Sequence, residues 1–177
     1  QPPKLPDADD AAQMHDAGCA LLEKHGYQHY ETSAFAQASM QARHNMNYWQ
    51  FGDYLGIGAG AHGKRSFLVD GELKLERRAR HKHPRNYMEH AGTPTAIQET
   101  RSLQAEQMPF EFCMNALRLH DGFPAHIYEK RTGQPMASLQ APLNRAKTLG
   151  LIDDIEQDIR PSDRGRRYLN DLLKLFL

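Results

Sequence analysis

The sequence has little cysteine: Cys19 and Cys113 are the two thiols among its 177 residues. Two thiols so far apart in the sequence indicate neither a disulfide framework nor a cysteine-rich metal site. The sequence also lacks any apolar run near the roughly 18 to 20 residues that a membrane-spanning helix needs, and no signal-peptide pattern opens it. We therefore expect a protein of a reducing compartment, the cytoplasm.

An excess of either charge is missing as well, because 22 Lys and Arg balance 22 Asp and Glu. That balance argues against a general affinity for nucleic acid or for an anionic membrane. Residues 107–177 hold ten Lys and Arg against nine Asp and Glu, whereas a DNA-reading domain normally shows a basic helix or patch. We expect no nucleic-acid partner.

The chain opens with three prolines among six positions and without an initiator Met. These residues predict an extended linker, and they favour a piece of a longer chain over a complete one. A helix should follow, capped by Asp7 and ended by Gly26, with Met14 and Leu21 on its apolar face. The aromatic and β-branched stretch at 27–35 then predicts a strand.

Glycine is concentrated between residues 52 and 63, where five glycines fall within twelve residues. The segment GIGAGAHG at 56–63 lacks the third glycine of the dinucleotide fingerprint, so we reject a Rossmann site. Alternating glycines instead predict a strand that lets another backbone or a flat ligand approach, and the sequence leaves both open. Residues 66–75 then predict a hairpin that turns at Asp70-Gly71.

From about Thr95 the pattern turns helical. Helices are predicted from residue 107, ended by Gly122, and at 124–131 and 136–149. Two short strands and a last helix capped by Ser162 should follow, in an order that resembles a winged helix.

The helix that begins near residue 107 should bury Phe110, Met114 and Leu117. The predicted fold class is α+β, with a domain boundary near residue 105. The two predicted domains are residues 1–105, with the glycine-rich strand and the hairpin, and the helical residues 106–177.

The sequence RHNMNYW places His44, Asn45, Tyr48 and Trp49 close together, and Trp49 is the single tryptophan of the chain. In a helical turn His44 and Tyr48 would share one face. Such a face offers an imidazole as an axial iron ligand and an aromatic surface for a macrocycle. The alternative is a loop in which His44 bonds a backbone carbonyl and Trp49 anchors the chain in the core. Spacing alone leaves both open.

The motif HNMNYW at 44–49, together with YETSAFA at 30–36 and YLGIGAGAHG at 54–63, resembles HemW-type proteins, radical-SAM relatives of oxygen-independent coproporphyrinogen III oxidase. The segments EFCMNALRLHDGF, KTLGLI and SDRGRRYLND resemble the C-terminal domain of that family. The resemblance runs from about Leu5 to the end. It implies the last strands and helices of a partial radical-SAM α/β barrel, followed by a mostly helical C-terminal domain.

The family's radical chemistry needs three cysteines at C-x3-C-x2-C spacing to hold a [4Fe–4S] cluster that binds S-adenosylmethionine. This chain has no such spacing, so it should not bind the cluster itself. The resemblance therefore implies these cofactors for a full-length parent alone. We find no independent enzymatic site in the chain.

The resemblance implies haem as the ligand, with His44 on the iron, Tyr48 and Trp49 beside the macrocycle, and Asn45 orienting the site. Positional match to the oxidases adds Gly58, Gly60 and His62 as residues that border the cofactor site. The expected function is haem binding and delivery to haem-accepting respiratory proteins, in the cytoplasm or peripherally at the inner membrane. The alternative is a fragment of an oxygen-independent coproporphyrinogen III oxidase.

The basic stretch from His62 to His90 holds eight Lys and Arg against four Asp and Glu. His81, His83 and His90 lie among these cations, which disfavours a metal site and favours a solvated basic surface. Arg77 and Arg78 could instead pair with haem propionates, because Arg binds carboxylates bidentately. Strand edges left without barrel neighbours also predict self-association.

Overall fold

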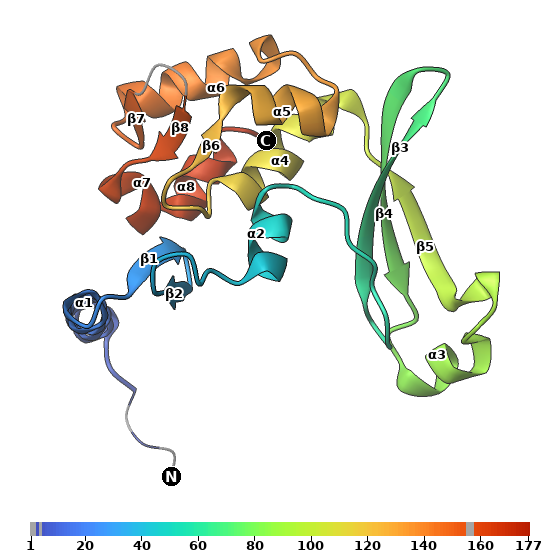
Figure 1. The fold of residues 1–177 in the computed structure, drawn as a ribbon, viewed down its shortest axis with the longest axis horizontal. Helices are drawn as coiled ribbons and strands as arrows, with labels where there is room; N and C mark the ends of the chain where they lie inside the picture. The colour runs from blue at the N-terminus through green and yellow to red at the C-terminus, as the bar shows by residue number, and fades with distance from the viewer. Residues whose placement is uncertain (1–2, 4, 155–157) are drawn as a thin grey trace.

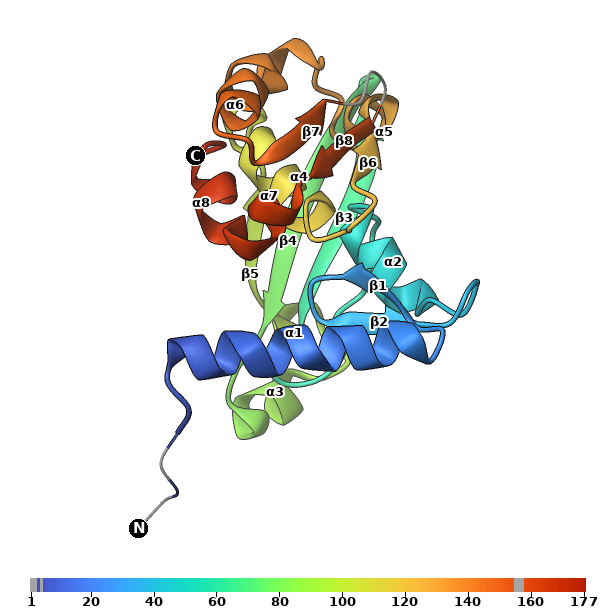
Figure 2. The same ribbon diagram turned by 90° about the vertical axis from the view of Figure 1, so that its left-hand side faces the viewer.

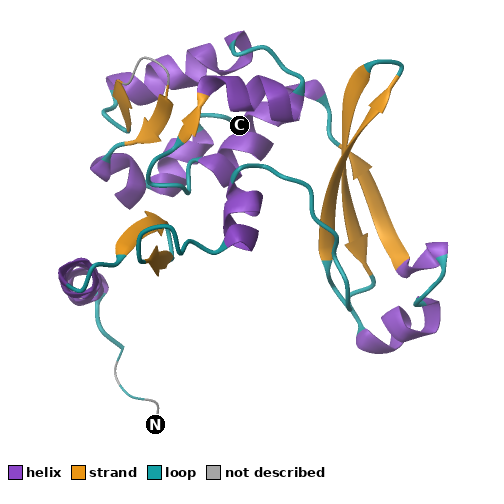
Figure 3. Cartoon of the chain, viewed as in Figure 1, coloured by secondary structure: helices purple, strands orange, loops and turns teal. Residues whose placement is uncertain are grey.

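The computed structural model describes residues 3, 5–154 and 158–177. Its elements form three groups along the chain (Figures 1 and 3): an N-terminal helix with a small hairpin, a long antiparallel meander, and C-terminal helices with a three-stranded sheet. The short helix α2 (Arg43–Trp49) lies between the first group and the C-terminal helices (Figure 1). The α+β class predicted from the sequence is confirmed.

Helix α1 (Ala8–Lys24) begins where its sequence predicts. The Asp7 carboxylate accepts hydrogen bonds from the N–H groups of Asp9 and Asp10 at 3.0 and 2.9 Å, which satisfies two donors that a helix start leaves free. Although the structure describes every residue from 8 to 24, none of them is buried. Figure 2 shows α1 as a rod that crosses one side of the molecule.

The single strand predicted at 27–35 is wrong, because the chain turns back within it. Two antiparallel strands form instead, β1 (Gln28–Glu31) and β2 (Ala34–Ala36). The N–H and hydroxyl of Thr32 both donate to the carbonyl oxygen of Arg118, at 3.1 and 3.3 Å. A partner 86 residues away thus bends the chain, which local pattern does not reveal.

The predicted hairpin at 66–75 is confirmed and is longer than expected. It is formed by β3 (His62–Val69) and β4 (Glu72–Arg80), joined through Asp70 and Gly71 with φ of 52° and 83°, as a type I′ turn requires. A third strand, β5 (Ile97–Ser102), pairs with β4 in the order β3-β4-β5.

The helical stretch predicted from Thr95 is therefore wrong over these residues, because pairing with β4 overrides local preference. Two short elements connect β4 to β5, namely α3 (Pro84–His90) and the 3₁₀ turn η1 (Pro94–Ala96).

The glycine-rich strand predicted at 56–63 is also wrong, because most of this segment is an irregular loop. Gly58 and Gly60 have φ of 107° and 71°, which removes them from strand geometry. The expected close backbone approach is present, since a Cβ atom on Gly56 would collide with the backbone of His62.

The C-terminal group has the winged-helix order that its sequence predicts. The turn η2 (Ala105–Gln107) leads into α4 (Met108–Ala116), and the further elements are β6 (Phe123–Pro124), α5 (Ala125–Thr132), α6 (Ala137–Thr148), β7 (Ile152–Asp154), β8 (Asp158–Pro161), α7 (Asp163–Arg167) and α8 (Leu169–Lys174). The strands pair in the order β6-β8-β7, and Ser162 caps α7 as expected. The sequence places a polar turn at Asp153-Asp154, but these residues belong to β7. Residues 155–157, where the second predicted strand should begin, lie outside the described residues.

The hydrophobic core is centred on α4 and includes Leu117 as predicted, although the other buried residues of the helix lie on a different face than predicted. Phe112, Cys113 and Ala116 are fully buried, whereas Phe110 and Met114 remain partly exposed. Phe51 and Leu75 belong to the same core cluster, so the packing extends across the predicted domain boundary. That boundary near residue 105 stays a prediction.

Candidate functional site

The motif HNMNYW lies in helix α2, which agrees with the helical turn and not with the loop among the two sequence interpretations. His44 is exposed and Tyr48 is half-buried, and their rings meet edge to face with centroids 5.4 Å apart. The two side chains therefore share one face of the helix, with the imidazole in solvent. An exposed imidazole beside an aromatic ring can bind a metal centre without first breaking a buried contact.

Tyr48 is fixed by a second tyrosine that follows the helix. The rings of Tyr48 and Tyr54 stack with centroids 3.9 Å apart. Burial, and then the hydrogen bond with Tyr54, raise the pKa of the Tyr48 phenol far above its ordinary value. Tyr48 is therefore a neutral phenol at any physiological pH.

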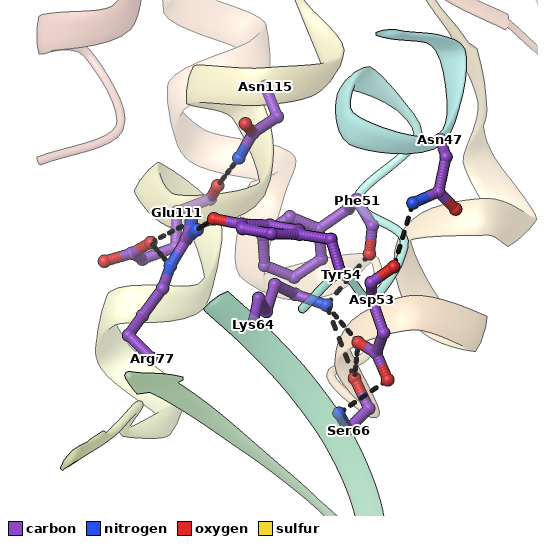
Figure 4. Close-up of polar contacts among 9 residues, drawn as sticks. All are labelled: Asn47, Phe51, Asp53, Tyr54, Lys64, Ser66, Arg77, Glu111 and Asn115. Atoms are coloured by element: carbon purple, nitrogen blue, oxygen red, sulfur yellow. Dashed lines mark hydrogen bonds and ion pairs between the residues drawn. The ribbon is translucent and has the colours of Figure 1, made fainter. Parts of the chain in front are cut away.

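The end of α2 is anchored through its backbone and through Asn47 (Figure 4). The Asn47 amide donates to the carbonyl oxygen of Asp53 at 2.9 Å. Gly52 packs so closely against Asn47 that a Cβ atom there would overlap it. Asn45, which we expected to orient the site, makes no side-chain hydrogen bond within the described residues. Asn47 is thus the asparagine that holds the helix end.

A buried lysine lies next to the residues that follow α2. Lys64 is 2% exposed, and its ammonium group donates to the carbonyl of Phe51 at 3.0 Å and to Asp53 at 2.8 Å (Figure 4). Burial lowers the pKa of Lys64, while the bond to Asp53 opposes that change. Burial alone would raise the pKa of Asp53, but bonds from Lys64 and Ser66 outweigh it and lower the pKa. The ion pair between Lys64 and Asp53 thus links β3 to the residues that follow α2.

A second polar link joins the motif to α4 (Figure 4). Arg77 of β4 donates to the Tyr54 hydroxyl at 2.8 Å and to Glu111 at 2.8 and 3.2 Å. Arg101 of β5 donates to the other Glu111 oxygen at 2.6 Å. The carboxylate of Glu111 is 9% exposed, so one buried anion ties two strands and α4 together.

Trp49, at the last position of α2, is half-buried beneath a cation. The guanidinium of Arg118 lies over its ring, 4.5 Å from the centroid. The indole nitrogen is buried without a hydrogen-bond partner in the described chain. Trp49 therefore contacts the residues that follow α4, as well as its own helix.

A pocket of about 430 Å³ opens beside the motif. Tyr48, Tyr54 and His62 line one part of it, and Met114 contributes apolar surface. The structure thus brings His62 to the same pocket as Tyr48. Gly58 and Gly60 are held elsewhere: their N–H groups donate to the Tyr87 hydroxyl at 3.3 Å and to the His81 carbonyl at 2.8 Å.

The basic stretch is a solvated surface only in part. Arg77 is 19% exposed and bound to Glu111, and Arg80 donates to the Gly56 carbonyl at 2.6 Å, so that prediction is wrong for both residues. Lys82 and Arg85 are exposed as predicted. Over the described residues, no group of three or more His, Cys, Asp and Glu side chains is arranged to hold a metal ion.

Sequence reasoning missed the residues that support the motif. Tyr54, Lys64, Glu111 and Arg118 are spread over the segment from residue 54 to residue 118, and no local spacing joins them. The sequence gives no local signal for them: Lys64 stands beside Arg65 and Ser66 in a polar stretch that directly follows the glycine-rich loop.

A family model for the HemN C-terminal domain matches residues 103–168. Two curated relatives are similar over the full chain: the heme chaperone HemW of Haemophilus influenzae, 39% identical, and that of Escherichia coli, 38% identical. This chain covers 44% and 45% of their lengths, so it spans less than half of these relatives.

A solved structure, described as the radical SAM enzyme coproporphyrinogen III oxidase (HemN) from Escherichia coli, has a similar fold. It matches with a TM-score of 0.66 and 17% identity, over 97% of this chain and 42% of that one. Among the residues described here, no helix combines the length and apolar character that crossing a membrane requires. The chain therefore shares the HemN C-terminal domain over residues 103–168 and is similar over its full length to HemW proteins.

Proposed function

We propose that this chain supplies the haem-contacting part of a haem chaperone. The observation that carries the proposal is the exposed imidazole of His44, set edge-on to Tyr48 at 5.4 Å on a helix that is anchored on its other side. The relatives of this chain over its full length are named for haem chaperoning, which supports the same ligand.

In this proposal His44 binds the haem iron through a ring nitrogen. Tyr48 and Trp49 flank the macrocycle, whose large apolar face supplies most of the binding free energy. Asn45, partly exposed one position after His44, is free of other partners in the described chain and available to orient the ligand. His62 borders the same pocket, whereas Gly58 and Gly60 are assigned to a cofactor border in the longer protein.

The haem propionates need cations. Arg77 already holds Glu111 and Tyr54, which makes it a poor partner. Arg78 shares its counter-ion Glu76 with Arg65 and is 33% exposed in the pocket wall. Arg78 is therefore the preferred propionate partner.

A [4Fe–4S] cluster and S-adenosylmethionine belong to the longer parent in this proposal. The two thiols of this chain do not fit the cluster, since Cys19 lies on α1 and Cys113 is fully buried in the core. Burial also raises the pKa of Cys113 well above the ordinary thiol value, which disfavours the thiolate that iron requires.

The test is a haemin titration followed at the Soret band, comparing the chain with its His44→Ala variant. His126→Ala is the matched control, because His126 is likewise an exposed histidine on a helix. We expect saturable one-to-one binding that His44→Ala loses by at least about tenfold and that His126→Ala retains. Equal affinity of all three proteins would overturn the role of His44.

The alternative function is oxidative decarboxylation of coproporphyrinogen III by the longer parent, with which the fold of the HemN structure is compatible. Incubating the full-length protein with coproporphyrinogen distinguishes the two, since a chaperone retains haem without turning coproporphyrinogen over. We further propose haem-accepting respiratory proteins as partners, a cytoplasmic location with peripheral contact to the inner membrane, and self-association through the exposed N-terminal elements.

A further inference from the structure

Arg118 lies between the half-buried ring of Trp49 and the buried carboxylate of Glu31. It follows α4 and lies over the indole ring of Trp49, 4.5 Å from the centroid. Its guanidinium is also 3.9 Å from a carboxylate oxygen of Glu31, on β1. One side chain of the C-terminal group thus contacts both the motif helix and the N-terminal hairpin.

The surroundings of Arg118 explain why it stays in this place. The Glu31 carboxylate is 3% exposed, and one of its oxygens has no hydrogen-bond partner in the described chain. An uncompensated buried carboxylate is costly, so its attraction holds the guanidinium nearby. The Arg118 backbone is held as well, because its carbonyl oxygen accepts from Thr32.

Trp49 needs such a neighbour. Its indole nitrogen is buried and makes no hydrogen bond in the part of the chain that the structure describes. The indole therefore depends on ring contacts: the planar cation of Arg118 over its face, and the Tyr48 ring edge to face at 6.1 Å between centroids. Because Trp49 is the last residue of α2, its position sets the orientation of the helix that bears His44.

We propose that Arg118 is a positioning residue, which fixes Trp49 and thereby holds α2 in the orientation that its ligand requires. This inference rests on the proposed haem-binding function. It adds a route by which the C-terminal domain acts on the motif, through Trp49 from one side and through Glu111, Arg77 and Tyr54 from the other.

The test uses Arg118→Lys, which keeps the positive charge near Glu31 but loses the planar group that stacks on the indole. Arg145→Lys is the control, since Arg145 is exposed on α6. Fluorescence of Trp49 is the first readout, because no other tryptophan contributes to the emission. We expect a shifted emission maximum in Arg118→Lys at an unchanged urea midpoint, and unchanged emission in the control.

Haemin affinity is the second readout. Loss of the stacking contact should weaken binding by about threefold to tenfold, the range that a cation–π contact supports. Unchanged Trp49 emission, or shifted emission with unchanged haemin affinity, would overturn the inference.

If the unsubstituted chain fails to bind haemin, the proposed function is the part that fails. The emission of Arg118→Lys then still decides whether Arg118 fixes Trp49.

Discussion

Helices α1 and α4 contrast sharply in what they bury. Helix α1 has 17 residues and a capped start, yet it buries none of them. Helix α4 has nine residues, of which six are buried: Met108, Glu111, Phe112, Cys113, Asn115 and Ala116. The comparison shows that strong local signals form a helix without making it part of a core. Tertiary packing decides which helix organises the fold.

The largest expected effect is at the centre of α4. Phe112 is fully buried, and its ring meets those of Phe51, Phe123 and Tyr128. Phe112→Ala should lower the free energy of unfolding by about 3–5 kcal/mol, measured by urea denaturation. Met88→Ala, at a side chain that is 74% exposed, should change it by less than about 0.5 kcal/mol. Similar losses in both variants would contradict the contrast.

The next effect concerns the buried anion of α4. Glu111→Gln keeps the shape of the side chain but removes the charge that Arg77 and Arg101 share. It should lower the free energy of unfolding by about 2–3 kcal/mol, measured by urea denaturation. The control is Glu89→Gln, which breaks an exposed pair with Arg85 and should cost less than about 0.5 kcal/mol. An equal loss of unfolding free energy in the two variants would show that burial does not strengthen the ion pairs of Glu111.

A smaller effect tests how firmly the N-terminal group docks behind α4. The ring of His120 contacts that of His29 at 4.0 Å between centroids. Burial, and then the charges of His29 and Arg166, lower the pKa of His120 to about 4, although Asp163 opposes the change. The unfolded chain binds this proton near pH 6.5, so the stability from the neutral ring is complete above that pH.

This stability is lost as the pH falls from about 6.5 towards 4. Urea midpoints measured across this range should fall less steeply for His120→Phe than for the unsubstituted chain. Carboxylates titrate in both proteins, so the difference between the two curves reports His120 together with its contact to His29. Parallel curves would show that the ring contributes nothing to docking.

The smallest effect on stability belongs to α1. Met14→Lys with Leu21→Lys changes side chains that are 67% and 59% exposed, and should alter the free energy of unfolding by less than about 0.5 kcal/mol. The same variant should reduce self-association in light scattering, because it removes exposed apolar surface. A monodisperse monomer before substitution would contradict the predicted self-association.

Sequence reasoning succeeded where one local signal determines the outcome. The Asp7 cap, the Asp70-Gly71 turn and the Ser162 cap each act within four residues of their partners. It failed where a distant strand decides, as at Thr32, whose partner lies at residue 118, and in β5, which pairs with β4. Local patterns do not encode such pairings.

The candidate site divides in the same way. The i, i+4 spacing of His44 and Tyr48 gave their shared face correctly, since helix geometry alone sets it. The groups that hold this helix in place come from β1, β3, β4 and α4, which meet only after folding. The shared face of His44 and Tyr48 could thus be predicted, and the contacts that support the helix could not.

The hydrogen bonds of the glycine-rich loop at 56–63 couple the local opening of this loop to that of α3. Its backbone is tied to the far end of the meander by three bonds, from Gly58 to Tyr87, from Gly60 to the residue 81 carbonyl, and from Arg80 to Gly56. Breaking one of them exposes the others to water. The loop and α3 should therefore open together, and their amide protons should exchange at one common rate, faster than those of α4.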